Sequence, residues 1–152
     1  MMAKFSLDLT EYAKRTGARM DTIVRGVVMG LAERIDERTP VGNPDIWQFP
    51  KSAPPGYAGG HARKNWQYKF GSVPEGEVEG VDPKGSRTAQ NAILAGVRAS
   101  PVAGVHYLAN NVPYAERLEN GWSHVQAPGG MVKLAVIDFQ GIVRDEVARL
   151  SA

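Results

Sequence analysis

The sequence has no cysteine among its 152 residues. Disulfide bonds, thiolate metal sites and a cysteine nucleophile are therefore excluded. It also has no stretch that approaches the roughly 18 consecutive apolar residues of a membrane-spanning helix, and its N-terminus lacks the apolar segment of a secretory signal. We therefore expect a soluble, intracellular protein that makes no membrane contact.

An excess of charge of one sign is missing as well. The formal net charge is +2, and acidic and basic residues alternate through most of the chain. This balance does not by itself favour nucleic-acid binding. Because 43% of the 152 residues are apolar, the chain can bury one ordinary core but is short for two. We expect a single domain that covers residues 1–152.

The usual signatures of catalysis are absent too. No G-x-S-x-G elbow and no G-x-x-x-x-G-K-[ST] phosphate loop occurs. The histidines have no second ligand at helical spacing: His61, His106 and His124. Glu116 and Glu119 could form a carboxylate pair for acid–base chemistry or a metal, or they could face solvent or pair with Arg117 and a neighbouring chain. We expect no enzyme activity, no cofactor and no metal.

Apolar residues at helical spacing predict three main helices. The first runs from about Leu9 to Glu37, with a break near Gly17, and its stripe comprises Ile23, Val24, Val27, Val28, Leu31 and Ile35. The second follows Ser86, a potential N-cap, and its apolar side comprises Ala89, Ala92, Ile93 and Val97. The third spans five turns near the C-terminus, with a strand over 131–137 as the alternative, and its stripe comprises Val132, Val136, Phe139, Val143, Val147 and Leu150.

Three shorter segments favour strands, and one favours a single helical turn. Trp66, Tyr68 and Phe70 alternate with polar residues, which is typical of a half-buried strand. Residues 77–81 form a weak candidate for a returning strand, residues 105–109 form another candidate, and 114–118 a helical turn. We expect an α+β fold in which a small antiparallel sheet of about three strands packs with a long N-terminal helix, a middle helix and a C-terminal helix.

Residues 39–64 contain five prolines and four glycines, too many for a regular helix or sheet. Thr39-Pro40 ends the first helix, because proline lacks the backbone donor that a helix needs. The segment nevertheless holds Trp47, Phe49 and Tyr57, whereas disordered linkers are poor in aromatic residues. We expect an extended arm over 39–64 that lies between the first helix and the first strand and reaches beyond its own domain.

The charges around this arm are segregated. Between Ile46 and Pro74 there is no acidic residue, and the basic residues there are Lys51, Arg63, Lys64 and Lys69. An acidic block follows directly, and it consists of Glu75, Glu77, Glu79 and Asp82. Basic residues mixed with aromatic rings could bind DNA over 51–69. Alternatively, the two patches could join identical subunits head to tail, or neutralise each other within one chain.

Four segments together resemble the tail-completion (tail-component) family of long-tailed bacteriophages: "RTPVGNPDIW", "PPGYAGGHARKNW", "NNVPYAERLENGWSHVQAPGGMV" and the C-terminal run. The family's motifs correspond here to Thr39-Pro40-Val41, to Gly59-Gly60 with Asn65-Trp66, and to Pro113-Tyr114-Ala115 with Glu119 and Gly121. The resemblance covers nearly the whole chain. Shorter members run from T-P-V almost directly to the glycine-rich segment, so the part with Trp47 and Phe49 is an insertion.

The resemblance implies a non-enzymatic structural protein that completes the head-proximal end of a phage tail and helps it join the capsid. It implies a ring of identical subunits, with a hexamer as the expected form, in contact with the tail terminator, the tail tube and head-completion proteins. Genomic DNA in the channel would be a passing contact. The expected location is the virion, at the tail or neck, and the host cytoplasm during assembly.

The arm, the charge layout and the resemblance together predict one set of subunit or partner contacts. In the arm, Trp47, Phe49 and Tyr57 would be anchors on a neighbouring subunit. Tyr114, Glu119 and Trp122 would form a shared structural corner near a subunit boundary. Alternatively, Tyr114 and Trp122 would only close the core, and Glu119 would be solvated. The full predicted set is Trp47, Phe49, Tyr57, Arg63, Lys64, Trp66, Glu75, Glu77, Glu79, Tyr114, Arg117, Glu119 and Trp122.

Overall fold

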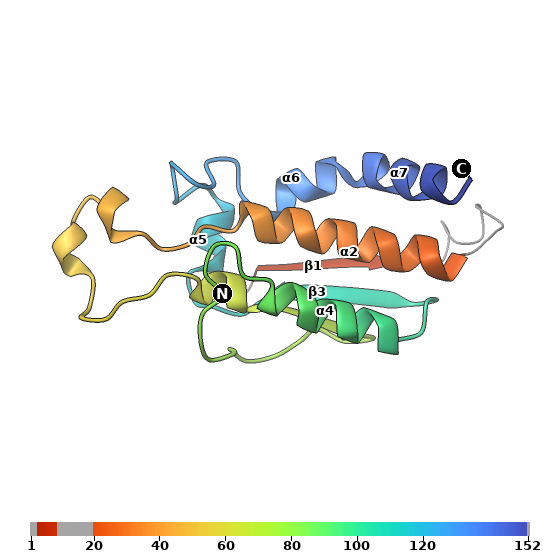
Figure 1. Cartoon of the computed structure of the whole chain (residues 1–152), viewed down its shortest axis with the longest axis horizontal. Helices are drawn as coiled ribbons and strands as arrows, with labels where there is room; N and C mark the ends of the chain where they lie inside the picture. The colour runs from red at the N-terminus through yellow and green to blue at the C-terminus, as the bar shows by residue number, and fades with distance from the viewer. Residues whose placement is uncertain (1–2, 9–19, 152) are drawn as a thin grey trace.

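The computed structural model describes residues 3–8 and 20–151 and has an α+β fold, as the sequence predicts. An antiparallel sheet has the strand order β1 (Ala3–Asp8), β3 (Val105–Asn110) and β2 (Trp66–Phe70). The helices α4 (Thr88–Ala99), α2 (Met20–Arg38) and the pair α6 (Val132–Ile137) and α7 (Phe139–Ser151) lie side by side in that order (Figure 1). The strands lie behind α2 and α4 in this view.

The core forms where α2 meets its neighbours. All six residues of the predicted α2 stripe are buried: Ile23, Val24, Val27, Val28, Leu31 and Ile35. In α4, Ile93 and Val97 are buried, whereas Ala92 faces solvent and was assigned to the wrong side. Between α4 and the sheet the packing is close, because a Cβ on Gly96 would collide with the ring of Tyr68. This interior fixes the frame that carries the arm.

The predicted strands at 66–70 and 105–109 are present as β2 and β3, but one predicted strand is absent and one strand was not predicted. Residues 77–81 form a loop, whose backbone is held by a side chain: Asn65 Oδ1 accepts from the Val78 N–H at 2.7 Å, and Asn65 Nδ2 donates to the Val78 carbonyl at 3.0 Å. Gly76 and Gly80, both with positive φ, flank this contact and do not continue a strand. The strand that pairs with the other edge of β3 is β1, which was not predicted; residues 9–19, which the first predicted helix includes, lie outside the described part of the chain.

The C-terminal run is helical, so the alternative of a strand over 131–137 is excluded. It is divided into α6 and α7 at Asp138, however, and does not form one straight helix. Ala135 and Ile142 belong to the core, and five residues of the predicted stripe pack against it: Val132, Phe139, Val143, Val147 and Leu150. Val136, predicted to be buried, is 43% exposed. Among the described residues, no helix is both long enough and apolar enough to span a membrane.

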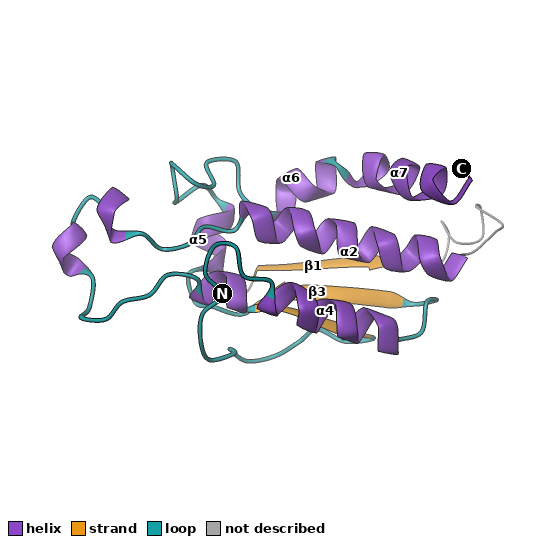
Figure 2. Ribbon diagram, viewed as in Figure 1, coloured by secondary structure: helices purple, strands orange, loops and turns teal. Residues whose placement is uncertain are grey.

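The predicted arm is an excursion between α2 and β2, with two short helical turns at its far end (Figure 2). These turns are η1 (Pro44–Ile46) and η2 (Pro50–Ser52), and each begins with proline, whose fixed φ suits the first position of a helix. The end of the predicted segment differs from the expectation, because 61–64 form the helix α3 (His61–Lys64), with Ala62 and Arg63 buried in the body. A short helix, α5 (Ala115–Glu119), lies where a helical turn was predicted.

Candidate functional site

The arm is fixed where it leaves the body. Thr39 Oγ1 donates to the carbonyl of Ile35 at 2.7 Å and accepts from the indole N–H of Trp66 at 2.7 Å, so one hydroxyl joins the end of α2 to the start of β2. Trp66 is 3% exposed. It therefore belongs to the core and not to a partner surface, contrary to the sequence-based prediction. The T-P-V and N-W motifs thus meet in space.

The two halves of the arm touch just beyond this point. A Cβ on Gly59 would collide with the backbone of Gly42, and a Cβ on Gly42 would collide with the ring of Tyr57. Tyr57 also contacts Trp47 edge-to-face, with ring centroids 5.1 Å apart. Such pairs of aromatic rings restrict both side chains with few rotatable bonds to fix. The lower part of the arm is therefore packed on itself.

The outer part, which we call the arm tip (residues 44–52), exposes apolar side chains. Phe49 is 69% exposed and Ile46 is 45% exposed, although both are large hydrophobic residues. The segment with the turns η1 and η2 lies at the end of the molecule farthest from α7 (Figure 1). Asn43 caps η1 by accepting from the Asp45 N–H at 3.1 Å, which orders the backbone that presents these two side chains. The arm tip is an apolar surface on an ordered support.

Arg63, predicted to contact a partner or DNA, is inside the body. It is 8% exposed and forms a two-pronged ion pair with Asp36 of α2, with Nη2–Oδ2 at 2.5 Å and Nε–Oδ1 at 3.3 Å. Its Nη1 donates to the Pro83 carbonyl at 3.0 Å. The sequence missed Asp36 as a partner because it lies 27 positions away. Arg63 therefore joins α2, α3 and the loop before α4.

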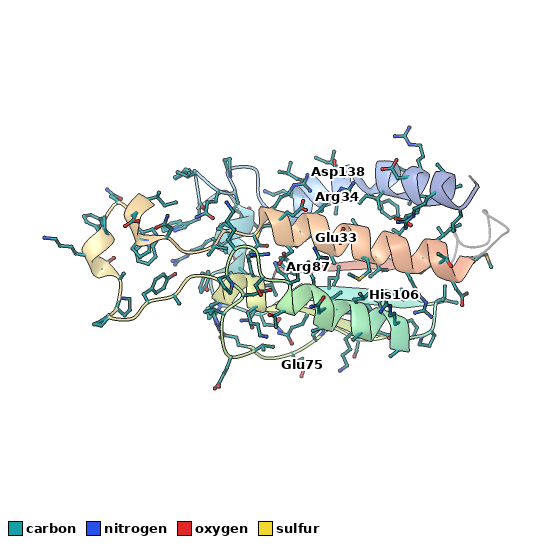
Figure 3. The ribbon with its side chains drawn as sticks, in the orientation of Figure 1. Glu33, Arg34, Glu75, Arg87, His106 and Asp138 are labelled. Atoms are coloured by element: carbon teal, nitrogen blue, oxygen red, sulfur yellow. The ribbon has the colours of Figure 1, made fainter. Side chains whose placement is uncertain are left out.

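The acidic block divides into two kinds of residue. Glu75, Glu77 and Glu79 are exposed, and Glu75 lies at the lower edge of the view in Figure 3. Of these, Glu77 accepts from Nε2 of His61 at 3.0 Å, while Nδ1 of His61 faces the Gly80 carbonyl at 2.9 Å. The hydrogen bond to Gly80 and then that to Glu77 raise the pKa of His61. This pair joins the acidic block to the base of the arm within the chain, as does the hydrogen bond from the Asp82 N–H to the Gly60 carbonyl at 2.9 Å.

Asp82 is different, because it is completely buried. Its carboxylate accepts from the Ala89 N–H at 3.0 Å and from the Thr88 N–H at 3.4 Å, at the start of α4. Desolvation opposes its ionisation, but hydrogen bonds from Ser86, Ala89 and Thr88 outweigh it and lower the pKa of Asp82. Ser86, predicted to be the N-cap, lies one residue before the observed N-cap Arg87. Its hydroxyl accepts from the Thr88 N–H at 3.4 Å and so shares the start of α4 with Asp82, which was predicted to belong to an acidic surface.

Glu119 has the same role at α6. Its Oε2 accepts from the N–H groups of Met131 and Val132 at 3.0 and 2.8 Å, and its Oε1 accepts from the Lys133 N–H at 2.8 Å. A carboxylate at a helix start satisfies free donors and interacts favourably with the helix dipole. Glu116 is exposed, so the two carboxylates do not form an acid–base pair. In the part of the chain that the structure describes, no group of three His, Asp or Glu side chains could hold a metal.

The remaining predicted residues are exposed at the surface: Tyr114, Arg117 and Trp122. Trp122 is 66% exposed and lies beside Arg117, whose guanidinium carbon is 5.3 Å from the ring centroid. Tyr114 is 39% exposed. Desolvation raises the pKa of Tyr114, and the nearby Tyr57 and Glu77 raise it further. Tyr114 is thus close to both the lower arm and the acidic loop.

The predicted basic surface is reduced to separate lysines. Lys51 is exposed on the arm tip, Lys69 is exposed on β2, and Lys64 is half-buried in α3. Because Arg63 is buried, only these three lysines remain of the predicted basic surface, and they belong to three different elements. They do not share a helix face or a strand.

A second surface, which the sequence did not indicate, lies where α2 meets the junction of α6 and α7. A shallow groove of about 350 Å³ there is lined by Arg34, Ile137, Asp138, Gly141, Arg144 and Asp145. We call it the α6–α7 groove. Asp138 pairs with Arg38 at 2.8 Å and with Arg34 at 3.7 Å, and Figure 3 shows Arg34 and Asp138 adjacent between α2 and α6. Ile137, at 75% exposure, is the apolar part of this groove.

Comparison of the chain with protein-family models, with curated proteins and with solved structures gave no match. The resemblance to the tail-completion family therefore stays a prediction from the four motifs.

Proposed function

We propose that this chain is a structural protein that completes the head-proximal end of a phage tail by assembling into a ring with copies of itself, and that it helps the tail join the head. The observation that carries the proposal is the arm tip, where Phe49 is 69% and Ile46 45% exposed at the end of an ordered excursion. Exposed apolar patches of this kind mark protein–protein contacts.

The support of the arm favours contact with a partner over a passive loop. Trp47 and Tyr57 pack together, Gly42 and Gly59 bring the two halves into contact, and prolines begin both turns. Such preorganisation lowers the conformational entropy that a partner must remove on binding. An aromatic anchor on a stiff support is a typical source of binding energy.

The assignment to phage tails rests on the sequence resemblance, and two of its motifs have structural roles. Thr39 joins α2 to Trp66, and Glu119 caps α6. Both roles preserve the frame from which the arm projects. The proposed partners are therefore the neighbouring subunit, the tail terminator, the tail tube and head-completion proteins, in the virion neck or tail.

The test is a double variant, Trp47→Ser with Phe49→Ser. We expect a folded monomer with an unchanged circular dichroism spectrum that no longer forms rings or completes tails, as judged by electron microscopy and by complementation of tail assembly. Val81→Ser is the control, because Val81 is also an exposed apolar residue, at 40%, but lies outside the arm. Normal ring formation by the double variant would contradict the proposal.

DNA binding by residues 51–69 is the alternative function, and the burial of Arg63 against Asp36 weakens it. Lys51, Lys64 and Lys69 remain as cations for phosphate. A salt titration of DNA binding separates the two functions, because each phosphate contact contributes a slope of about −0.9 in log K against log salt. We expect no measurable binding at physiological salt; a steep slope that Lys51→Ala and Lys69→Ala reduce would favour the alternative.

A further inference from the structure

The glycine at position 141 has no explanation within its own chain. Gly30 of α2 is required by packing, because a Cβ at this position would collide with Ile142 of α7, whereas a Cβ on Gly26 would only displace the carboxylate end of Glu146. At Gly141, by contrast, a Cβ would meet no atom within 4 Å, and the residue lies inside α7, where glycine is less favourable than alanine. Glycine is expected where another backbone or a ligand approaches closely.

Ile137 is one helical turn before Gly141 and is 75% exposed. A large apolar side chain therefore lies next to a residue that has no side chain, on one side of the α6–α7 groove. This combination fits a ring that lies flat on the helix and contacts Ile137. Phe49 of the arm tip, at 69% exposure, is such a ring on an ordered support.

The charges of the two surfaces also match. Among the described residues, Arg144 and Asp145 of the groove have no ion-pair partner, and the same holds for Asp45 and Lys51 of the arm tip. Each surface thus offers one unpaired acid and one unpaired base. Opposite charges around an apolar centre are the usual arrangement of a protein–protein contact.

Resting on the proposed self-assembly, we propose that the arm tip of one copy binds in the α6–α7 groove of the next copy. The contact places Phe49 against Ile137 and Gly141, with Lys51 toward Asp145 and Asp45 toward Arg144. Because the two surfaces lie on different parts of the molecule, the contact is head-to-tail, and repetition of it closes a ring or extends a filament. A pairing of two arm tips would leave the groove uncovered.

Cysteine cross-linking tests this contact directly, because the natural chain has no cysteine. Lys51→Cys and Asp145→Cys variants, which keep the apolar centre of the contact, are mixed at a concentration at which the wild-type protein assembles, and are then oxidised mildly. We expect a disulfide-linked dimer only in the mixture. Lys51→Cys mixed with Ala95→Cys is the control, because Ala95 is exposed on α4, away from the groove.

Each other outcome of the cross-linking has a definite meaning. Dimers of Asp145→Cys alone, in preference to the mixed dimer, would overturn the proposal in favour of a two-fold contact between grooves. Wild-type rings without any mixed dimer would overturn the arm–groove contact and leave the assembly proposal standing. Wild-type protein that stays monomeric at every concentration would overturn both.

Variants provide the second measurement, by sedimentation equilibrium. Gly141→Leu fills the groove and should weaken self-association at least about thirtyfold, the loss typical of a central contact residue, whereas Ala95→Leu should not change it. Lys51→Glu and Asp145→Lys should each weaken it up to about fivefold, as expected for pairs at the rim. The two charge reversals combined should restore it. Failure of this rescue would contradict the proposed pairing of Lys51 with Asp145.

Discussion

Removal of the carboxylate of Asp36 should cost more stability than the loss of any surface ion pair. Asp36 is 5% exposed and Arg63 is 8% exposed, so both charges of the pair are out of water. Asp36→Ala leaves the guanidinium of Arg63 buried, with the Pro83 carbonyl as a remaining acceptor at 3.0 Å. Removal of one partner of a buried pair typically costs about 3–5 kcal/mol.

That magnitude is large compared with the whole stability of a domain, about 5–15 kcal/mol. At about 2–4 °C for each kcal/mol in a chain of this size, the melting temperature should fall by about 6–20 °C. Glu33→Ala is the matched control, because it removes the Arg87–Glu33 pair, whose side chains are 62% and 47% exposed. Figure 3 shows this pair at the surface between α2 and α4. Its loss should cost about 1 kcal/mol or less.

The assay is urea unfolding followed by circular dichroism, with thermal melts in parallel. A second variant, Asp36→Leu with Arg63→Met, should recover most of the lost stability, because well-packed apolar residues often replace a buried ion pair without loss. It also keeps the test informative if Asp36→Ala does not fold. The reasoning would be refuted if Asp36→Ala were no more destabilising than Glu33→Ala.

Three further predictions concern single positions. Glu119→Ala should lower the free energy of unfolding by about 1–2 kcal/mol, because it leaves three backbone N–H groups at the start of α6 without an acceptor. The control Glu116→Ala should change the free energy of unfolding by less than about 0.5 kcal/mol. Urea unfolding measures both variants. Gly141→Ala should raise the stability of the monomer by up to about 1 kcal/mol, since its Cβ meets nothing. By NMR, the pKa of His61 in the folded chain should lie above the value of about 6.5 in the unfolded chain. The stability that His61 contributes is therefore fully present below that pH and is lost as the pH rises through the folded pKa. Glu77→Gln should reduce this pH dependence.

Local patterns predicted the parts of the fold that depend on one strong repeat. The α2 stripe was correct, because its apolar residues leave a single face that must be buried. The C-terminal stripe was correct at five of its six positions, because Val132, Phe139, Val143, Val147 and Leu150 pack against the core and only Val136 is exposed. In β1, the sequence AKFSLD does alternate between apolar and polar residues, but a six-residue alternation is a weak signal beside a long helical pattern.

The polar residues could not be predicted in the same way, because their partners are distant in the sequence. Arg63 and Asp36 are 27 positions apart, and the Glu119 carboxylate meets donors 12 to 14 positions later. Composition around Arg63 indicated a basic surface, since local sequence does not distinguish a buried cation from an exposed one. Asn65 likewise holds Val78 by two hydrogen bonds that replace the predicted strand pairing.

These intrachain partners sharpen the argument for what the arm does. Three charged residues near the base of the arm make contacts within the chain: Arg63 joins three segments, His61 bonds to the acidic loop, and Asp82 caps α4. The arm tip differs from the base of the arm, because its largest apolar side chain is not buried within the chain. Phe49 remains 69% exposed although Trp47, two residues before it, is packed against Tyr57, so the segment that orders the arm does not bury its most apolar side chain. Burial of a phenylalanine side chain contributes about 1.5–3 kcal/mol of favourable free energy. Within a single chain, Phe49 does not make this contribution. A second copy of the chain, with the α6–α7 groove open to it, can supply that burial.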